Sequence, residues 1–384
     1  MNFKLINVAI LSVLVMVSCS KDEVVSNADT SSQNAISFNA LSSLAQTKAT
    51  PINSSNLTTT DFDVFAFTQD GKAFMGNVDT DFAHDGVKIV YKNGKWDYDD
   101  PNELAYWPTT DNPLDFYAIS PAVSIVDDNY TLHYTWNFNP ASQKIHYLCM
   151  DEYAEGTDKH ADHDVMYGIA KAQTKITNNG VVKFTFKHIL SQIVFKARTE
   201  LESMNVTIKD IKIHNAKISG TFTLPTDAST HATAANWELP SLGNYNPVVI
   251  RNASVEVNSS TTVTDISSAT PIFTIPQTLT KWVVSGYTKT KLNADNAGQS
   301  YLEIACKIKQ NGVYLFGSEN KFNTLYVPFG VSWEPGYRYI YTLIFGGGYD
   351  DQGEPILTPI TFDADVEEWA DEEMNVNTSV GGVN

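Results

Sequence analysis

The sequence has few cysteines, an excess of acidic over basic residues, and only one long apolar run. Its 384 residues include only Cys19, Cys149 and Cys306, which are too few and too far apart for a disulfide framework. Lys and Arg number 26 against 44 Asp and Glu, and the net charge of -18 would repel phosphate backbones. We therefore exclude nucleic acid as a partner. After residue 17 no stretch approaches the roughly 20 apolar residues that a membrane-spanning helix needs.

Sequence signatures of catalysis are also missing. There is no Gly-x-Ser-x-Gly elbow, no phosphate-binding Gly loop, no Cys-x-x-Cys and no His-Glu-x-x-His. The densest group of metal-ligand types, His160 to Asp164, is better explained as a polar loop that enters a strand at Val165. The acidic clusters at 97–100 and 350–351 lack the alternating ligands of a calcium loop. We expect neither an enzyme nor a metal or other cofactor.

The N-terminus has the pattern of an exported protein. Lys4 precedes an apolar run from Leu5 to Val17, which has the length of a secretory h-region. Ser18-Cys19 directly after it resembles the lipobox of bacterial lipoproteins, although Met16 departs from the usual Leu. The resemblance implies a signal peptide over 1–18 and a palmitate-bearing Cys19 anchored in the lipid of the outer membrane. The alternative is an ordinary signal peptide with a chance cysteine.

A short strand is expected to follow a flexible tether. Residues 19–35 are mostly polar, which suits a stalk between membrane and domain. Ile36, Phe38 and Ala40 then alternate with polar residues, as in a strand with one buried face. A second polar stretch, 46–56, separates this strand from everything after it. The strand is thus isolated between polar segments.

The rest of the chain has the two-residue period of β-strands. Alternation of apolar and polar residues recurs in several runs, namely 62–64, 132–138, 182–186, 206–208, 302–308 and 339–345. Asn93-Gly94 and Asn311-Gly312 lie between such runs and predict type I′ hairpins. The alternation places Cys306 on an apolar face, where it would be a buried hydrophobic residue. We predict an all-β fold of two antiparallel β-sandwich domains, with a boundary within 171–180.

Several segments resemble the fimbrillin family, the subunits of type V pili, and they occur in the order found in that family. They are Ile36-Ser-Phe38 with Thr47-Lys48-Ala49-Thr50, Trp96, Tyr106-Trp107-Pro108, Leu114 to Pro121, Phe186 to Phe195, Ile275-Pro-Gln277, Trp333 to Tyr341 and Val366 to Trp369. The resemblance implies tandem transthyretin-like β-sandwich domains over 36–175 and 176–370. It also implies a structural or adhesive subunit at the cell surface, in a fimbria.

The family resemblance implies a proteolytic step in the second polar stretch. In fimbrillins a trypsin-like protease cuts after a basic residue, the first strand leaves, and a strand of another subunit takes its place. Lys48 is the only Lys or Arg between Lys21 and Lys72, so the expected cut is at Lys48-Ala49. That cut would remove the strand region 36–48. Better-known family members carry Arg here, which leaves the protease open. The alternative is that Lys48 is a solvated loop residue and the chain stays intact.

The C-terminal tail, 371–384, is a candidate donor strand. Met374, Val376, Thr378 and Val380 would share one face of an extended segment. A frayed tail would have a similar sequence. The expected partners are other pilus subunits, the processing protease, membrane lipid through Cys19, and a host glycan or protein. The alternative function is a monomeric surface lipoprotein that binds a glycan or host protein through Trp107, Trp136 or Trp237, residues that otherwise belong to the core.

Overall fold

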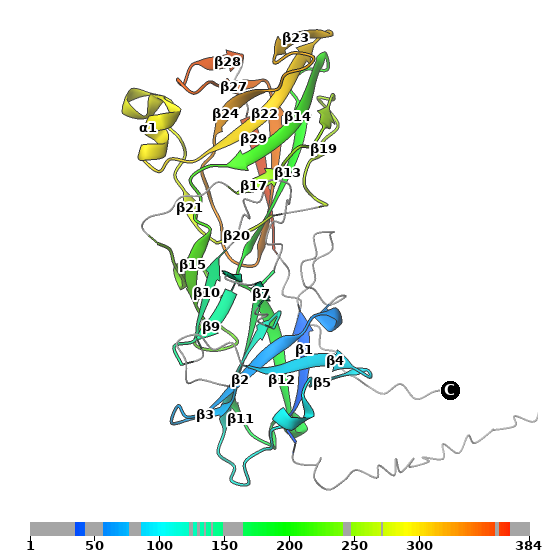
Figure 1. Ribbon diagram of the computed structural model, residues 1–384, viewed down its shortest axis with the longest axis vertical. Coiled ribbons are helices and arrows are strands. Elements are labelled where there is room, and N and C mark those ends of the chain that lie inside the picture. The colour runs from blue at the N-terminus through cyan, green and yellow to red at the C-terminus, as the bar shows by residue number, and fades with distance from the viewer. Residues whose placement is uncertain are drawn as a thin grey trace, which may run out of the picture.

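In the computed structural model, strands account for nearly all regular structure (Figure 1), which confirms the all-β prediction. The structure describes residues 35–42, 57–76, 86–122, 126–128, 131–133, 136–139, 141–148, 164–240, 247–269, 272–357 and 361–368. Among these residues the single α-helix is α1 (Lys291–Asn296), and five short 3₁₀ turns accompany it, η2 (Leu57–Thr59), η3 (Pro101–Glu103), η4 (Thr177–Gly180), η5 (Ala234–Asn236) and η6 (Gly286–Lys289). No helix in these ranges combines the length and the apolar character needed to cross a membrane.

The strands of the N-terminal half close into a ring. They are β1 (Ser37–Ser42), β2 (Phe62–Thr68), β3 (Ala73–Met75), β4 (Val87–Lys92), β5 (Lys95–Tyr98), β6 (Leu114–Ser120), β11 (Met166–Gln173) and β12 (Val181–His188). The pairing order is β3-β2-β4-β5-β1-β12-β11-β6, and β2 also pairs with β6. Because β2 and β6 pair as well, the path β2-β4-β5-β1-β12-β11-β6 returns to β2. Its inward residues form one buried cluster that includes Phe62, Phe116 and Phe184.

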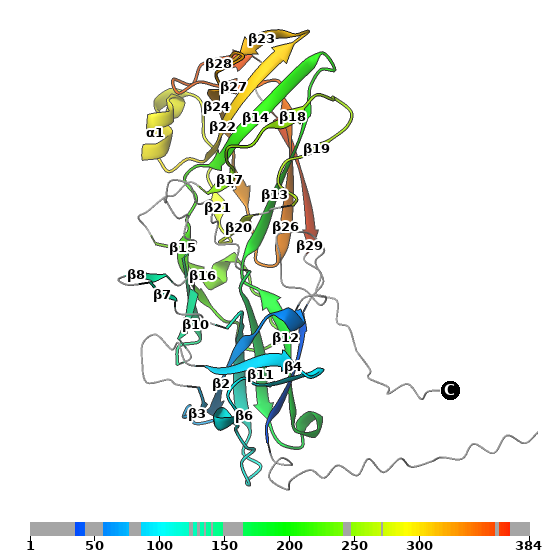
Figure 2. The ribbon, with the colours of Figure 1, turned by 45° about the vertical axis from the view of Figure 1, so that its right-hand side comes forward.

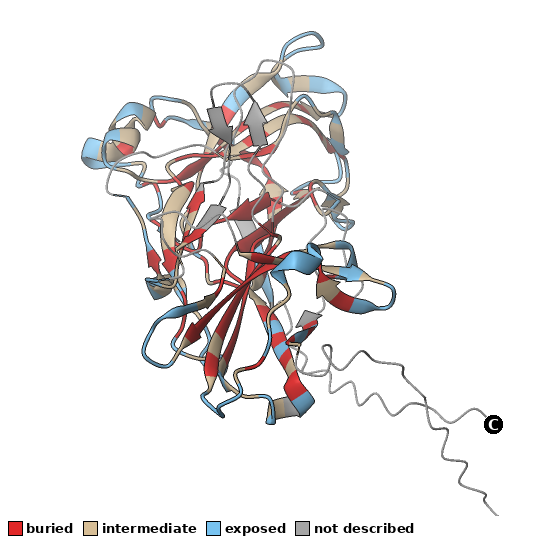
Figure 3. Cartoon of the chain, turned by 60° about the horizontal axis from the view of Figure 1, so that its bottom comes forward, coloured by how far each residue is buried: buried red, intermediate tan, exposed pale blue. Residues whose placement is uncertain are grey.

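A smaller sheet covers the other face of this half. It consists of β9 (Trp136–Asn139), β10 (Lys144–Leu148), β15 (Ser219–Thr223) and β16 (Trp237–Glu238). Phe65 and Phe67 of β2 pack against it, on the face opposite to Phe62, so β2 is buried on both faces. Figure 3 shows buried residues along these strands and exposed residues in the connecting loops.

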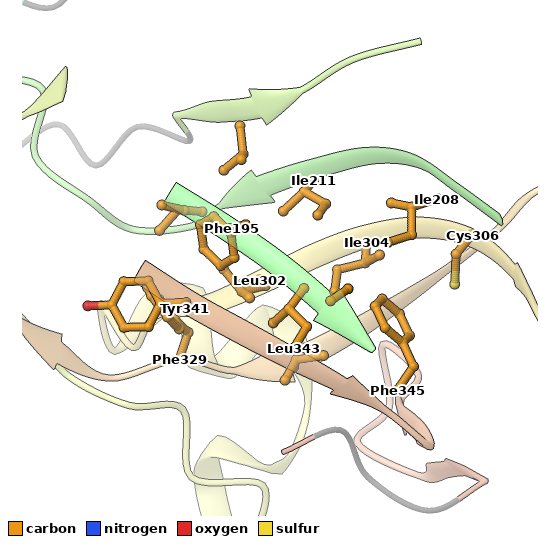
Figure 4. Close-up of a cluster of buried hydrophobic side chains, with 14 of the residues drawn as sticks. Phe195, Ile208, Ile211, Leu302, Ile304, Cys306, Phe329, Tyr341, Leu343 and Phe345 are labelled. Atoms are coloured by element: carbon orange, nitrogen blue, oxygen red, sulfur yellow. The ribbon is translucent and has the colours of Figure 1, made fainter. Parts of the chain in front are cut away.

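The C-terminal half contains two facing sheets. The strands are β13 (Ser191–Thr199), β14 (Met204–Ile213), β17 (Val248–Ile250), β18 (Val255–Val257), β19 (Thr264–Asp265), β20 (Ile272–Thr274), β22 (Tyr301–Gln310), β23 (Val313–Phe316), β24 (Asn323–Pro328), β26 (Tyr337–Phe345), β27 (Gly347–Tyr349), β28 (Pro355–Leu357) and β29 (Thr361–Glu368). One sheet is β19-β13-β26-β29 with β20, and the other runs β17-β14-β22-β24-β27-β28 with β18 and β23. Figure 4 shows side chains of β13, β14, β22 and β26 meeting between them. Two further pairs, β7 (Val126–Asp128) with β8 (Thr131–His133) and β21 (Thr278–Leu279) with β25 (Val331–Ser332), are separate.

The structure confirms both predicted hairpins and the predicted place of Cys306. Asn93 and Gly94 join β4 to β5 with φ of 54° and 79°, and Asn311 and Gly312 join β22 to β23 with φ of 49° and 82°. These left-handed values are those that a type I′ turn requires. Cys306 is fully buried and unpaired, and burial raises the pKa of its thiol. Cys149 lies outside the described residues.

Two details differ from the sequence-based expectation. The run 132–138, expected as one strand, is divided between β8 and β9, which pair in different sheets. Among the described strands two pairings are parallel, β1 with β12 and β13 with β26, although an antiparallel fold was expected. The domain boundary near residue 175 stays a prediction. We note that β12, which follows it, pairs with β1 and β11 of the N-terminal half.

A polar network lies at the edge of the C-terminal half. Glu303 Oε2 lies 2.8 Å from His214 Nε2, and Lys212 Nζ lies 3.5 Å from Glu303 Oε1. The Tyr301 hydroxyl lies 3.1 Å from His214 Nδ1 and donates to Asp295 over 2.6 Å. The His214 side chain, with Lys212, holds the pKa of the Glu303 carboxyl below its ordinary value of 4.5 despite partial burial. The network therefore favours the ionised carboxylate.

The lowered pKa of Glu303 makes stability depend on pH in a defined direction. A carboxyl whose pKa is lower in the folded than in the unfolded state stabilises the fold above the unfolded pKa, and this contribution disappears as pH falls through the folded pKa. We expect Glu303→Gln to lower the free energy of unfolding by about 1 kcal/mol at about pH 7. Urea unfolding at several pH values should show the difference shrinking below about pH 4.5. A difference that is constant down to about pH 3 would contradict this assignment.

Candidate functional site

The place of β1 within the ring is the candidate functional site. The strand runs parallel to β12 over its whole length, from Ser37 opposite Val181 to Ser42 opposite Phe186. On its other side it meets β5 antiparallel, at Phe38 opposite Trp96. Figure 1 shows β1 beside β12 and β5 in the lower part of the molecule. β1 is therefore an interior strand, and the ring closes only through it.

One face of β1 is buried and the other is exposed. Ile36, just before the strand, and Phe38 and Ala40 are buried, whereas Ser37 and Asn39 are exposed. This confirms the strand predicted at 36–40. Full burial of side chains the size of Ile36 and Phe38 contributes about 1.5–3 kcal/mol each. The strand thus carries a substantial share of the core of this half.

The Phe38 side chain occupies an aromatic pocket. Its ring centroid lies 5.7 Å from that of Tyr98, 6.4 Å from that of Phe116 and 6.3 Å from that of Phe184. These three residues come from β5, β6 and β12, so the pocket is assembled from strands that are distant in sequence. Each ring pair at such a separation stabilises the fold by about 0.5–1.5 kcal/mol beyond the burial of its apolar surface. We call this the Phe38 pocket.

Polar contacts fix the N-terminal end of the strand. The Ile36 amide donates to the Ala105 carbonyl over 2.9 Å, and the Tyr98 hydroxyl donates to the Ile36 carbonyl over 3.0 Å. Ala35 also forms a bridge with Tyr106. Burial raises the pKa of Tyr98, so its hydroxyl remains a donor at any physiological pH. These contacts set the register of β1 in the ring.

Loss of β1 would leave a slot that only another strand can fill well. The edges of β12 and β5 would present unpaired N–H and C=O groups, and the pockets of Ile36, Phe38 and Ala40 would open to water. An incoming strand can restore the main-chain hydrogen bonds and refill the pockets with alternate side chains. We call this space the β1 slot.

The other site residues expected from the sequence lie outside the described residues. These are the lipidation site Cys19, the cleavage site Lys48 and Ala49, and the tail residues Met374, Val376, Thr378 and Val380. The segment 160–163 lies outside as well, whereas Asp164 is described and its carboxylate is 2.9 Å from His188 Nδ1. In sequence, Lys48 follows the end of β1 at Ser42 closely.

Two of the tryptophans considered for glycan binding are buried. Trp107 donates through its indole to the Gly180 carbonyl, and Trp237 donates to the Ile189 carbonyl. The surface-binding role is therefore wrong for both, and the interpretation as core residues is confirmed. The reason is that each lies against aromatic or aliphatic neighbours in a buried cluster. Nothing is described for the Trp136 side chain.

The acidic clusters have local structural contacts. Asp100 accepts from the Asn102 amide at the start of η3, and Asp97 pairs with Lys95 at 3.2 Å. Asp350 accepts from the amides of Gln352 and Glu354 in a turn. Among the residues that the structure describes, no group of three or more His, Cys, Asp or Glu could hold a metal ion.

Sequence reasoning missed the partners of β1. The alternating side chains were predicted. The parallel pairing with β12 and the contacts of Tyr98 with Ile36 and Phe38 were not. The only available signal was that Trp96, Tyr98, Phe116, Phe184 and Phe186 are bulky aromatics in strands. Aromatic residues in strands are common in any core. The pattern could therefore not single out these residues.

Truncation of Phe38 tests its contribution to the fold. We expect Phe38→Ala to lower the free energy of unfolding by about 3–5 kcal/mol, because the ring is deleted from a closed pocket. Asn39→Ala, on the exposed face of the same strand, is the matched control and should change stability by less than about 0.5 kcal/mol. The free energies of unfolding of both variants are measured by urea denaturation. Equal losses of stability would contradict the placement of Phe38 in a closed aromatic pocket.

Comparison with known proteins agrees with this architecture. The chain matches no curated protein. A fimbrial protein of Bacteroides vulgatus is similar in structure, with a TM-score of 0.53 and 15% identity over 88% of this chain and 100% of that one. The tip fimbrial protein Mfa3 of Porphyromonas gingivalis, with a C-terminal truncation, is a more distant neighbour, with a TM-score of 0.37 and 10% identity over 81% of this chain and 94% of that one. The model of the fimbrillin-like family matches residues 47–369, and the chain therefore belongs to that family.

Proposed function

We propose that the chain is a structural or adhesive subunit of a cell-surface pilus, joined to its neighbour by exchange of β1 for a strand of that neighbour. The observation that carries the proposal is the position of β1 between β12 and β5 in the ring. The first strand of the described chain closes the ring, with Ile36, Phe38 and Ala40 buried in it. Membership of the fimbrillin-like family supports a pilus role and a location at the cell surface.

Cleavage at Lys48-Ala49 would release the strand. Lys48 lies in the polar stretch between β1 and η2, so a cut there separates β1 from the rest of the chain. β1 would then be held only by noncovalent contacts, which are its pairing with β12 and β5, the hydrogen bonds at Ile36 and its buried side chains. A donor strand with the same contacts and greater local concentration could displace it. The processing protease would be one that accepts Lys.

Acylated Cys19 would hold the unprocessed chain in the outer membrane, and the cut after Lys48 would free it from that anchor. The donor strand would come from the C-terminal part of the neighbouring subunit, where the tail presents Met374, Val376, Thr378 and Val380 on one face. The proposed function requires no catalytic group and no cofactor.

Blocking the cut should block assembly. We expect Lys48→Ala in the producing cell to abolish fibres that contain this chain, because β1 stays tethered and the slot stays filled. The matched control is Lys72→Ala, which removes an exposed lysine on a turn between β2 and β3 and should leave fibres unchanged. Electron microscopy of material sheared from cells, labelled with an antibody to the chain, provides the readout.

The N-terminal residue of the chains in the same material shows whether they were cut after Lys48. Sequencing should find Ala49 as the first residue of chains in fibres. Fibres composed of chains that still begin at a lipid-blocked Cys19 would overturn the proposed cleavage. Processed chains that never form fibres would instead favour a monomeric surface protein.

A further inference from the structure

Lysine side chains and aromatic rings gather on the outer face of the sheet that contains β14, β22 and β23. Lys307 and Lys309 hold alternate positions of β22, and the residue before each of them points into the core. Lys307 Nζ lies 4.3 Å from the ring centroid of Phe322, and Lys309 Nζ lies 4.5 Å from that of Tyr314. Lys209 of β14 also approaches the Phe322 ring, at 5.9 Å. We call these five residues the lysine face.

The lysine face lies far from β1. β22 and β23 form the upper end of the molecule in both views, whereas β1 lies in the lower half (Figures 1 and 2). All five residues of the lysine face are partly exposed to solvent. A partner can therefore reach this face while β1 is still in its place.

The ammonium groups of Lys307 and Lys309 keep their charge available. Among the described residues neither lysine forms an ion pair, although the chain has 44 Asp and Glu against 26 Lys and Arg. Lys307 Nζ donates to the Glu319 carbonyl, and Lys209 Nζ lies 3.9 Å from Asp210 Oδ2. An aromatic ring attracts a cation through its quadrupole and does not neutralise it. The rings thus hold the lysines in place and leave them charged.

The carboxylates at the border of the lysine face offset its charge only in part. Asp210 also accepts from a backbone amide over 2.7 Å, and Glu256 accepts from the Thr207 hydroxyl over 2.7 Å. Glu319 is exposed, as is Lys321 two residues further on. With Lys321, four lysines stand against these three carboxylates. The face is locally positive, in contrast to the net charge of -18 of the whole chain.

Short side chains form the surface between the lysines. Thr207 of β14 lies opposite Lys307, and Ala305 precedes Lys307 by two residues in β22. Thr324 of β24 lies opposite Ala305. Because these side chains are short, the lysines and the aromatic rings project beyond them. The face thus offers cations and apolar ring edges side by side.

We propose that the lysine face binds an acidic glycan, a carbohydrate chain that carries carboxylate or sulfate groups. Lys307 and Lys309 are two residues apart in one strand, so their Cα atoms are separated by about 6.6–6.8 Å. Two successive anionic groups of an extended glycan can each meet one of them, and Lys209 on the neighbouring strand receives a third. Hydrogen bonds from an ammonium to an anionic oxygen are stronger than neutral ones. The exposed edges of Tyr314 and Phe322 pack against the C–H groups of the sugar rings.

The composition of the face favours a glycan over an acidic protein. Lysine is depleted at the centre of protein–protein interfaces, where aromatic and other apolar side chains exclude water. Here Lys307 lies at the centre, with Thr207 and Ala305 beside it. This inference goes beyond the proposed pilus role and does not rest on strand exchange, because the intact chain presents the face.

Binding of defined oligosaccharides to the uncut full chain tests the inference. The probes are a heparin octasaccharide with sulfate and carboxylate groups, an oligouronate with carboxylates alone, and a neutral dextran oligosaccharide of the same length. We expect at least one acidic probe to bind and dextran not to bind. The affinity of a bound acidic probe should fall about tenfold between about 50 mM and 200 mM salt, because the contacts are ionic and exposed. Titration calorimetry gives the affinities.

Substitution of the central lysines locates the site. We expect Lys307→Gln with Lys309→Gln to weaken binding of the acidic probe about tenfold. The matched control is Lys72→Gln with Lys95→Gln, which removes the same charge from two exposed lysines that each pair with a neighbouring aspartate. The control pair should weaken binding by less than about twofold, since only long-range attraction changes.

Two further variants separate a built site from general attraction. Phe322→Leu keeps an apolar side chain but removes the ring, and we expect it to weaken binding about two- to fivefold. Glu319→Gln removes a negative charge from the border and should strengthen binding about twofold. Unchanged urea midpoints would show that the variants remain folded.

Several results would overturn the inference. These are equal weakening by the two lysine pairs, equal binding of dextran, and absence of binding of both acidic probes at about 50 mM salt. A polyglutamate peptide of equal charge that competes as well as heparin would assign the face to an acidic protein instead. Each of these results leaves the proposed pilus function intact, because fibre formation is measured separately.

Discussion

The packing of Phe38 between three aromatic rings is the contact on which the N-terminal half depends. Tyr98, Phe116 and Phe184 come from the three strands β5, β6 and β12, and the Phe38 ring lies against all of them. The backbone of β1 at the same time joins β12 to β5. A single segment thus supplies both a central part of the core and the closure of the sheet. A fold built in this way needs a strand in that place, but the strand need not belong to the same molecule.

Much of the fold could be predicted from local patterns. The Asn-Gly turns at 93–94 and 311–312 require left-handed backbone angles that few other residues adopt, so they located two hairpins correctly. Alternation located β2, β12, β14, β22 and β26, and it placed Cys306 in the core. Such features depend only on neighbours in sequence. The period of two is a property of the strand itself and is visible without knowledge of its partner.

Features that depend on partners could not be predicted in the same way. The parallel pairing of Ser37 with Val181 joins segments far apart in sequence, and nothing in either segment specifies the other. Alternation across 132–138 gave no sign that β8 and β9 belong to different sheets. The hydrogen-bond partners of Trp107 and Trp237, the carbonyls of Gly180 and Ile189, are likewise indicated by no local pattern. The same limit kept Tyr98 out of the sequence-based site.

The first strand of the described chain fills a place that would otherwise be a slot. Its apolar residues Ile36, Phe38 and Ala40 are buried, and its backbone joins β12 to β5. Hydrogen exchange of the β12 amides tests the central claim most directly. Amides within 181–186 should be protected in the intact chain, exchange rapidly once β1 has been cut and removed, and become protected again in assembled fibres. Equal protection in all three states would contradict the claim that β1 fills a slot that a second copy later occupies.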